Sequence, residues 1–346
     1  MIVKLGPRLA RMPRLLTQIA SLVLAATTFA ATARAEVGEV RLARQFGAIY
    51  LPIMVMEHQK LIEKQAAANG KPDFKVTWAQ FAGPAGMVDA LLSNSIDFTA
   101  QGVPSLALLW DKTRGGMGVK GLTAINESPL YLNTRRADVK SIKDLGEKDR
   151  IALPSPKVSI QAIYLQIAAE KAFGPGKHAA LDHLTVGMPH PEAMAALLSL
   201  QGELTTHFTV DPFHSREMKA GMKQITTSVE IGGGPATIIV LCSSEKFRQA
   251  NPEVFKIVNA AFGDALALIA SDPKRVAEIY LEMTRDKSTT AEELVAQMTA
   301  PEFKFTRTPN GIMTLVSFMN RIGTVKNKPE SWKDLFFDEA HALPGN

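Results

Sequence analysis

The chain has 346 residues, of which 46% are hydrophobic and 21% are charged. This mixture excludes a disordered or fibrous protein, and the length suits two domains or one bilobal body. The net charge of +5 comes from the first 35 residues, which hold five basic side chains and no acidic one. Because the rest of the chain is electrically balanced, it lacks the positive field that a nucleic-acid surface requires.

The first 35 residues have the three parts of a secretory signal peptide. Basic residues come first, the apolar run IASLVLAATTFAATA follows, and Ala33 and Ala35 flank Arg34 as small residues. A membrane anchor is the alternative, but the run is shorter than the ~20 residues that span a bilayer. We therefore expect cleavage after Ala35 and export to the periplasm, with no later segment apolar enough to span a membrane.

Cys242 is the only cysteine in the chain. It lies in the apolar stretch TIIVLCSS, which is typical of a buried strand. We therefore expect no internal disulfide, no cysteine that could carry a lipid after processing, and a monomeric protein.

Predicted strands and helices alternate along the first part of the body. Residues 39–46 and 74–81 read as strands, with a helix over residues 47–70 between them. A helix, a strand, a helix and a strand follow over residues 84–125. Strands and helices that alternate with short links are typical of a parallel sheet covered by helices.

A second run of the same kind begins at Leu130. Helices separate its predicted strands, one of those helices beginning at Pro156, and the strands are residues 130–134, 150–155, 181–188, 204–210 and 223–229. The apolar segment up to Ser244 is a further strand, and the remaining residues are mainly helical. We predict an α/β fold with two lobes, each a mainly parallel sheet flanked by helices. One lobe comprises residues 36–131 and 236–346, and the other comprises residues 132–235.

Four helices are predicted to start on a proline directly after a strand. The dipeptides are Gly83-Pro84, Val103-Pro104, Ser155-Pro156 and Asp211-Pro212. Ligands of open parallel sheets bind at the carboxyl ends of the strands, so these four starts are expected to line one cleft. Free N–H groups and the helix dipole favour an anion there. The bare Gly-Pro start offers no side chain to cap those N–H groups.

The order of several short motifs resembles one family of transport proteins. The segment TWAQFAGPAGMVDALLSNSIDFTAQGVPSLAL, with SIKDLGEKDRIALP, VDPF and NPEVF after it, resembles the nitrate, sulfonate and taurine substrate-binding proteins of ABC importers. The likeness covers roughly residues 40–279. It implies a two-lobed periplasmic-binding-protein fold of class II, with two crossings between the lobes. It also implies a permease and an ATPase as partners, and no enzymatic activity or cofactor.

Ala82 and the segment PSPKVS depart from the sulfonate-binding pattern. The favoured ligand is an aliphatic sulfonate, with its charged end after Gly83-Pro84 and its organic end near Phe46, Phe213 or Trp110. Nitrate, bicarbonate and a neutral heteroaromatic such as a pyrimidine precursor of thiamine remain open, and so does a less favoured pyrimidine-synthesising enzyme. That enzyme would need a cysteine-rich segment, which Cys242 alone does not supply.

Each candidate ligand residue has a simpler structural interpretation beside the functional one. Gly83 could serve a tight turn, Ser155 and Asp211 could cap helices, Lys157 could be solvated, and Phe213 could belong to the core. The residues predicted to bind the ligand are Gln45, Phe46, Gly83, Pro84, Gly102, Val103, Ser155, Lys157, Ser159, Asp211, Phe213 and His214.

Other chemistries lack their motifs. The glycines at residues 232–234 have neither the lysine nor the spacing of a phosphate loop. His183 and His190, or His207 and His214, are seven residues apart instead of four, which argues against a helical zinc pair. We expect no metal site and, since neither Gly-x-Ser-x-Gly nor His-Glu-x-x-His occurs, no hydrolase. A signal peptide stands where a transcription factor of this fold would carry its DNA-binding helices.

Overall fold

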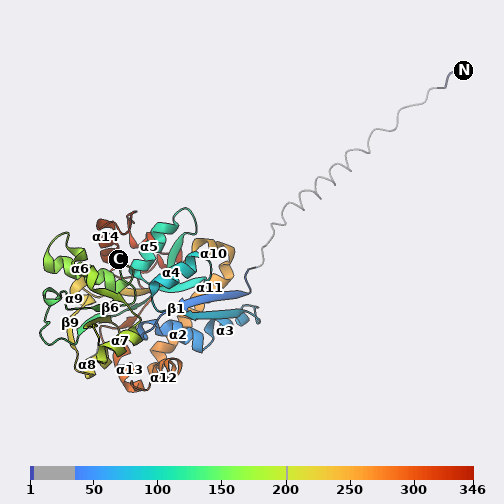
Figure 1. The fold of residues 1–346 in the computed structure, drawn as a ribbon. Coiled ribbons are helices and arrows are strands. Elements are labelled where there is room, and N and C mark those ends of the chain that lie inside the picture. The colour runs from blue at the N-terminus through green and yellow to red at the C-terminus, as the bar shows by residue number, and fades with distance from the viewer. Residues whose placement is uncertain (4–35, 200–201) are drawn as a thin grey trace. The chain divides into compact units, whose positions relative to one another are not determined.

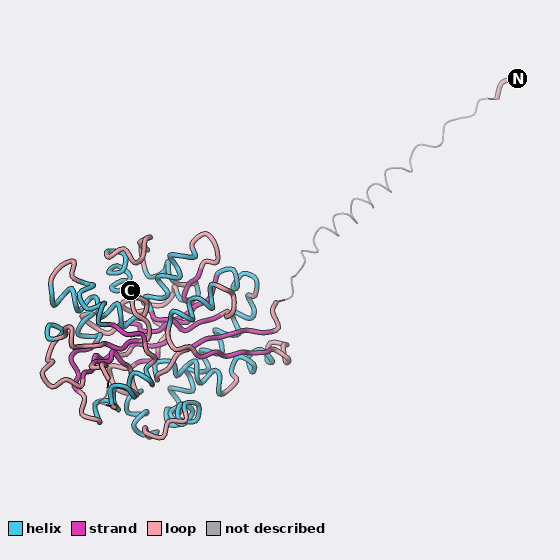
Figure 2. The backbone as a smooth tube through the Cα atoms, in the orientation of Figure 1, coloured by secondary structure: helices cyan, strands magenta, loops and turns pink. Residues whose placement is uncertain are grey.

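The structure is a computed structural model that describes residues 1–3, 36–199 and 202–346. Contacts divide the chain into a short unit, Met1–Glu36, and a body, Val37–Asn346. The predicted signal peptide lies almost wholly outside the described residues. In the body, strands form two groups with helices around them (Figure 2).

The first sheet has six strands in the order β11-β4-β10-β3-β1-β2. They are β1 (Glu39–Arg44), β2 (Lys75–Gln80), β3 (Phe98–Gly102), β4 (Val119–Glu127), β10 (Thr237–Ser244) and β11 (Lys304–Phe305). Every residue of β10 is buried, as expected for a β-branched apolar run in the middle of a covered sheet. Its helices from the first part of the chain are α2 (Leu51–His58), α3 (Leu61–Ala68), α4 (Pro84–Leu92) and α5 (Val103–Thr113).

The second sheet has five strands in the order β7-β6-β8-β5-β9. They are β5 (Tyr131–Thr134), β6 (Ile151–Leu153), β7 (Thr185–Gly187), β8 (Thr206–Thr209) and β9 (Lys223–Thr227). The helices of this part are α6 (Ile160–Phe173), α7 (His190–Leu198), α8 (Phe213–Lys219) and α9 (Ser228–Gly232). That the two sheets define lobes with the predicted boundaries stays a prediction.

In each sheet, the strand that follows a passage from the other sheet is antiparallel to both of its neighbours. Strand β10 is antiparallel to β3 and β4, and β5 is antiparallel to β8 and β9. The pairs of β1 with β2 and β3, and of β6 with β7 and β8, are parallel. The expectation of mainly parallel sheets therefore holds for their cores, while each complete sheet is mixed.

The last part of the chain is helical, as predicted. It contains α10 (Glu245–Ala250), α11 (Pro252–Ser271), α12 (Pro273–Thr284), α13 (Ala291–Met298) and α14 (Ile312–Arg321). Figure 1 shows α12 and α13 at one end of the body near α8, and α14 near α6. Short 3-10 turns cover Ala48–Tyr50, Ile142–Asp144, His178–Leu184, Trp332–Leu335 and Asp338–Ala340.

Helix α11 corrects one expectation from the sequence. By length and composition it is the one helix among the described residues that could cross a membrane, although no such segment was expected after the signal peptide. It packs against α2 and α3 of the body through an apolar face that includes Phe255, Val258 and Phe262. This packing is that of a core helix.

Three predicted elements have different bounds in the structure. The helix over residues 47–70 is divided into α2 and α3, because Lys60 adopts a left-handed conformation with φ 51°. The strand over residues 181–188 is reduced to β7, with a 3-10 turn before it. Helix α6 begins at Ile160 instead of Pro156, because Lys157 is also left-handed and Ser159 caps the helix.

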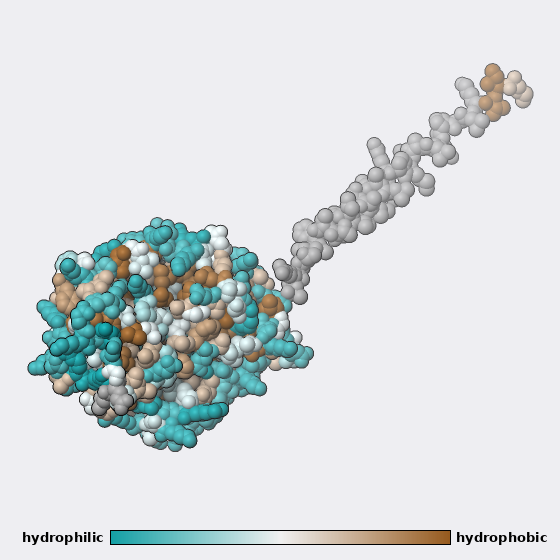
Figure 3. All heavy atoms as spheres, viewed as in Figure 1, coloured by the Kyte–Doolittle hydropathy of each residue, from teal (hydrophilic) through white to brown (hydrophobic). Residues whose placement is uncertain are grey.

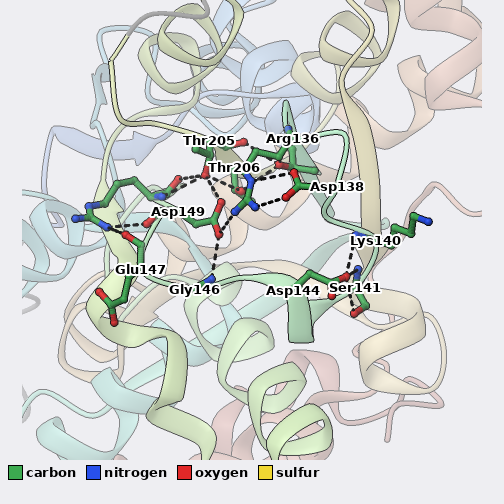
Figure 4. A network of polar contacts seen from close by, with 12 residues as sticks. Arg136, Asp138, Lys140, Ser141, Asp144, Gly146, Glu147, Asp149, Thr205 and Thr206 are labelled. Atoms are coloured by element: carbon green, nitrogen blue, oxygen red, sulfur yellow. Dashed lines mark hydrogen bonds and ion pairs between the residues drawn. The ribbon is translucent and has the colours of Figure 1, made fainter.

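A buried carboxylate holds the connection between β5 and β6 (Figure 4). Asp149 is fully buried and accepts hydrogen bonds from Arg136 Nη1 at 2.7 Å, Gly146 N at 3.0 Å and Thr205 Oγ1 at 2.8 Å. Arg136 also pairs with Asp138. These bonds satisfy a buried charge that would otherwise destabilise the fold, so we interpret the network as structural.

The surface shown in Figure 3 is mostly polar, with small apolar areas between polar residues. In the described body, Val37, Phe173 and Met218 are the large apolar residues counted as exposed, and they are far apart in the sequence. Single exposed apolar residues of this kind need no functional explanation.

Candidate functional site

A small cavity lies where strands of both sheets reach their carboxyl ends. Its volume is about 20 Å³, room for roughly one water molecule. The residues from the first sheet and its helices are Gln45, Phe46, Ile49, Tyr50, Pro84, Gly102, Ser105 and Ile239. Those from the second are Pro154, Ser159, Ile160, Gln161 and His190.

Three helices begin at this cavity. Gly83 and Gly102 are the N-caps of α4 and α5, and neither provides a side-chain cap. Helix α6 begins beside them, and the Ser159 hydroxyl accepts a hydrogen bond from Ala162 N at 3.3 Å. The uncapped starts leave N–H donors and the positive end of the helix dipole near the cavity.

The parts of the chain that form the first and the second sheet, called the two halves from here on, approach each other closely around the cavity. A side chain at Gly83 would collide with the Pro154 carbonyl oxygen and lie 2.7 Å from Ser155 Oγ. The Ser105 hydroxyl donates to the Val158 carbonyl at 3.2 Å, and Ala48 N donates to the Asp211 carbonyl at 3.0 Å. Only a glycine at residue 83 allows this close approach, and the two halves are in contact here.

The lining of the small cavity combines apolar and polar side chains and carries no full charge. Burial raises the pKa of the Tyr50 hydroxyl, so this group is neutral. Burial, with a contribution from His207, holds the pKa of His190 well below its usual range, so His190 is neutral as well. No hydrogen bond joins the Tyr50 hydroxyl to another residue in the described part of the chain. The site therefore offers dipoles and hydroxyl groups to a ligand.

A chain of buried hydrogen bonds runs from the cavity into the second half. Gln161 Nε2 lies 3.3 Å from His190 Nε2, and His190 Nδ1 lies 2.9 Å from His207 Nε2. His207 Nδ1 lies 2.6 Å from Glu217 Oε1, and Asn133 Nδ2 donates to Glu217 Oε2 at 2.8 Å. Since each ring nitrogen has a partner, the network fixes the orientation of His190 at the cavity wall.

A second, larger cavity of about 570 Å³ shares Phe46 with the small one. Its apolar lining comes from Phe46, Met54, Met194, Phe213, Tyr280 and Met283. Its charged lining comes from Arg44, Arg216, Arg285, Lys287 and Asp286. Both halves contribute, because Met194, Phe213 and Arg216 belong to α7 and α8.

The predicted ligand residues fall into four groups. Those that line the small cavity are Gln45, Phe46, Pro84, Gly102 and Ser159, while Phe213 lines only the larger one. Gly83 forms the close contact between the halves. The residues Val103, Ser155, Lys157, Asp211 and His214 line neither cavity.

Several of these residues have structural contacts instead. Lys157 is exposed, and Asp211 Oδ1 accepts hydrogen bonds from the N–H and hydroxyl groups of Ser215 in the first turn of α8, although the N-cap of that helix is Pro212. The peptide bond between Asp211 and Pro212 is cis. His214 stacks on Tyr131 at 3.6 Å between ring centroids. Trp110 lies against a different cavity, with Arg114 over its ring.

The cavity residues that sequence reasoning missed include Tyr50, Gln161 and His190. A usable signal exists for His190, because it follows the end of β7 just as Pro84 follows β2. Sequence spacing does not pair the histidines that meet, because His190 contacts His207, which is seventeen residues away. For Tyr50 and Gln161 the sequence carries no such signal.

The arrangement of the sheets defines the class of fold. Two α/β sheets with two passages between them and a reversed strand after each passage make up a class II periplasmic-binding-protein fold. No protein-family profile and no curated protein sequence matches the chain. Solved structures, however, match over most of its length.

The chain is similar to the aliphatic sulphonate-binding protein SsuA of Escherichia coli, with a TM-score of 0.62 and 16% identity over 88% of this chain and 93% of that one. It is similar to the alkanesulfonate-binding protein SsuA of Xanthomonas axonopodis pv. citri bound to MOPS, with a TM-score of 0.64 and 17% identity over 90% of this chain and 100% of that one. It is also similar to the periplasmic nitrate-binding protein NrtA of Synechocystis PCC 6803, with a TM-score of 0.67 and 15% identity over 89% of this chain and 90% of that one. At these identities the matches establish the fold.

Proposed function

We propose that this protein is the substrate-binding component of an ABC importer. It would capture a small organic anion between its two halves and deliver it to a membrane permease with its ATPase. The observation that carries the proposal is the convergence of both sheets' carboxyl ends, and of three helix starts, on one closed cavity. The three similar proteins of the same fold that are named above are called sulfonate-binding or nitrate-binding proteins.

The charged end of the ligand is proposed to bind at the starts of α4 and α5. Both starts lack a side-chain cap, so their N–H groups are available to an anion, and their dipoles act in a site from which water is excluded. An aliphatic sulfonate is our favoured ligand. Its organic part would extend past Phe46 toward Phe213 in the larger cavity.

The small cavity is too small for such a ligand in the present conformation, since it has room for about one water molecule. Binding therefore requires the halves to separate and then to close on the ligand by a hinge motion. We propose residues 36–131 with 236–346, and residues 132–235, as the two bodies that move.

A neutral heteroaromatic is the second candidate, because no charged side chain lines the small cavity. Phe46, Tyr50 and His190 could pack on a flat ring, and the amide groups of Gln45 and Gln161 could bind its nitrogen and oxygen atoms. Such a ligand would bind without a partner charge.

A thermal-shift screen of the mature protein tests the proposal. The panel contains alkanesulfonates, taurine, nitrate, bicarbonate and pyrimidines, and a ligand that binds only the native state raises the midpoint by mass action. The proposal expects an anion to raise it. A shift with uncharged rings alone would favour the second candidate, and no shift with any compound would contradict both.

The proposed location is the periplasm after cleavage behind Ala35. Residues 4–35 lie outside the described part of the chain, so this proposal rests on their sequence. N-terminal sequencing of protein from a periplasmic extract should begin at Glu36. Recovery of an intact Met1 in the membrane fraction would show that the segment is an anchor.

A further inference from the structure

The larger cavity contains a buried arginine with unused hydrogen-bond donors. Arg44, the last residue of β1, is 8% exposed and lines this cavity. Its Nε atom donates to Glu57 Oε2 at 3.0 Å. Its two terminal nitrogens, Nη1 and Nη2, have no partner among the described residues. A buried guanidinium with free terminal donors is a partner for a carboxylate, sulfonate or phosphonate, which it can bind in a bidentate manner.

The surroundings of Arg44 also favour negative charge. Arg216 is paired with Asp286 at 3.4 Å, as Arg44 is with Glu57. Arg285 and Lys287, by contrast, are exposed at the cavity and form no ion pair with another described residue. The charges within the two ion pairs cancel, and the positive charges of Arg285 and Lys287 remain. The cavity therefore attracts anions.

The remaining lining is suited to an organic body. Met54, Met194 and Met283 lie around the cavity with Phe46, Phe213 and Tyr280. Methionine side chains adapt to irregular ligands and make favourable contacts with aromatic rings. At about 570 Å³ the cavity is within the range of small-molecule sites.

We propose that the ligand of this protein is an organic dianion. One acidic group would occupy the helix starts at the small cavity, an apolar or aromatic body would pass Phe46, and a second acidic group would bind the Arg44 guanidinium. This inference rests on the proposed function. It adds to that function the ligand class and a residue that sets specificity.

Matched pairs of ligands test the proposal. In each pair a monoanion is compared with the dianion that has an added carboxylate. The monoanions are straight-chain alkanesulfonates of four to eight carbons and benzenesulfonate, and the dianions are the corresponding alkanesulfonates with a terminal carboxylate and 4-sulfobenzoate. Calorimetric titration of the wild-type protein should show, for at least one pair, a dianion that binds about ten-fold more tightly than its monoanion, as a charge-assisted bidentate contact provides. Equal affinities in every pair would overturn the proposal.

Two variants locate the effect. In Arg44→Gln the ratio of monoanion to dianion dissociation constants should fall to about one. In Arg41→Gln it should keep its wild-type value, because Arg41 pairs with Asp97 and lines neither cavity. A preference for dianions that persists in Arg44→Gln would overturn the proposal.

If Arg44→Gln does not fold, as judged from its thermal midpoint, Arg44→Lys decides. The lysine retains a charge beside Glu57 but cannot form the bidentate contact, so a preference as large as that of the wild type would overturn the assignment. Failure of the proposed function is distinguishable, because in that case neither member of any pair binds. Binding of monoanions with no gain for dianions contradicts only this inference.

Discussion

Gly83 is the residue whose replacement most directly tests closure. A β-carbon at this position would meet the Pro154 carbonyl oxygen and Ser155 Oγ of the other half. Gly83→Ala should therefore fold but should not reach the closed conformation. We expect its scattering radius to be larger than that of the wild type with ligand, and the ligand-induced thermal shift to be lost.

Gly146→Ala is the matched control for this variant, since nothing lies within 4 Å of a β-carbon there. It should close and bind as the wild type does. Normal closure of Gly83→Ala would show that the halves do not meet at this glycine when the ligand is bound.

His190 should make stability depend on pH. Its folded-state pKa lies well below its usual value, mainly because of burial. The folded protein therefore binds fewer protons than the unfolded chain at acidic pH, and the stabilisation present above ~6.5 is lost as pH falls, by about 1.4 kcal/mol per pH unit. Urea unfolding of the wild type and of His190→Gln measures this effect, and the variant should lose less unfolding free energy between pH 6.5 and 5.

Parallel pH profiles of the wild type and His190→Gln would count against this explanation. The variant keeps an amide that can bond to His207, so the hydrogen-bond chain is not left without a partner.

Sequence reasoning at the residue scale identified the positions directly after strands. Gln45, Phe46, Pro84 and Gly102 lie at or shortly after a strand end that is visible in the periodicity, and they line the small cavity; that they bind the ligand stays a prediction. Arg44 was not found, since a basic residue at the end of a strand gives no sign that it will be buried. The burial of Arg44 depends on neighbours that the fold brings to it. These are Glu57 of α2, its hydrogen-bond partner, and Tyr280 of α12, which lines the same cavity.

At the scale of single elements, α6 shows how a helix start can be misplaced. Pro156 suits a first helical position, yet Lys157 is left-handed and the helix begins four residues after Pro156, at Ile160, with Ser159 as its N-cap. Local preference was overridden by a turn whose conformation is rare for lysine. The long apolar helices of the last part of the chain were predicted well, because their hydrophobic periodicity extends over several turns.

The cap of α6 can be tested by itself. Ser159→Ala removes the hydroxyl that accepts from Ala162 N and should lower the unfolding free energy of the ligand-free protein by about 1 kcal/mol in urea titrations. Ser93→Ala is the control. Its hydroxyl lies at the exposed end of α4 and caps no helix start, so the change should stay within about 0.5 kcal/mol. Equal effects of the two substitutions would contradict the capping role.

At the scale of the whole molecule, ion pairs join the two halves. Arg321 on α14 binds Glu170 on α6 through both terminal nitrogens, at 3.0 and 2.5 Å. On the side of α8, Arg216 pairs with Asp286 and Lys219 pairs with Glu293. These pairs can form only when the halves are close, so they favour the closed state.

Arg321→Ala should weaken ligand binding up to about five-fold, because an exposed pair contributes at most about 1 kcal/mol. Titration calorimetry at low salt measures the effect, which should shrink at high salt. Arg275→Ala is the control, since Arg275 pairs with Glu278 and Glu282 on its own helix and should not affect closure. A loss of affinity in the control as large as that of Arg321→Ala would mean that general charge, not the link between halves, is responsible.

The division of the chain between the two sheets was predictable in outline, because the strand and helix pattern repeats and then returns to an apolar strand at β10. The distance between the halves was not predictable. It depends on contacts such as that of Gly83 with Pro154, which join residues of separate sheets.

The two passages between the sheets lie side by side. Glu127 pairs with Thr237 where they leave the first sheet, Tyr131 pairs with Thr227 where they enter the second, and Leu130 and Ser228 exchange two hydrogen bonds between these points. The second passage carries α9 (Ser228–Gly232), so the joint consists of two chain segments that are paired at both sheets and bonded between them. Such a joint should bend more easily about a single line across both segments than it twists. Opening should therefore follow one angular coordinate, and one pair of fluorescent labels on opposite halves should report the complete motion as a single relaxation.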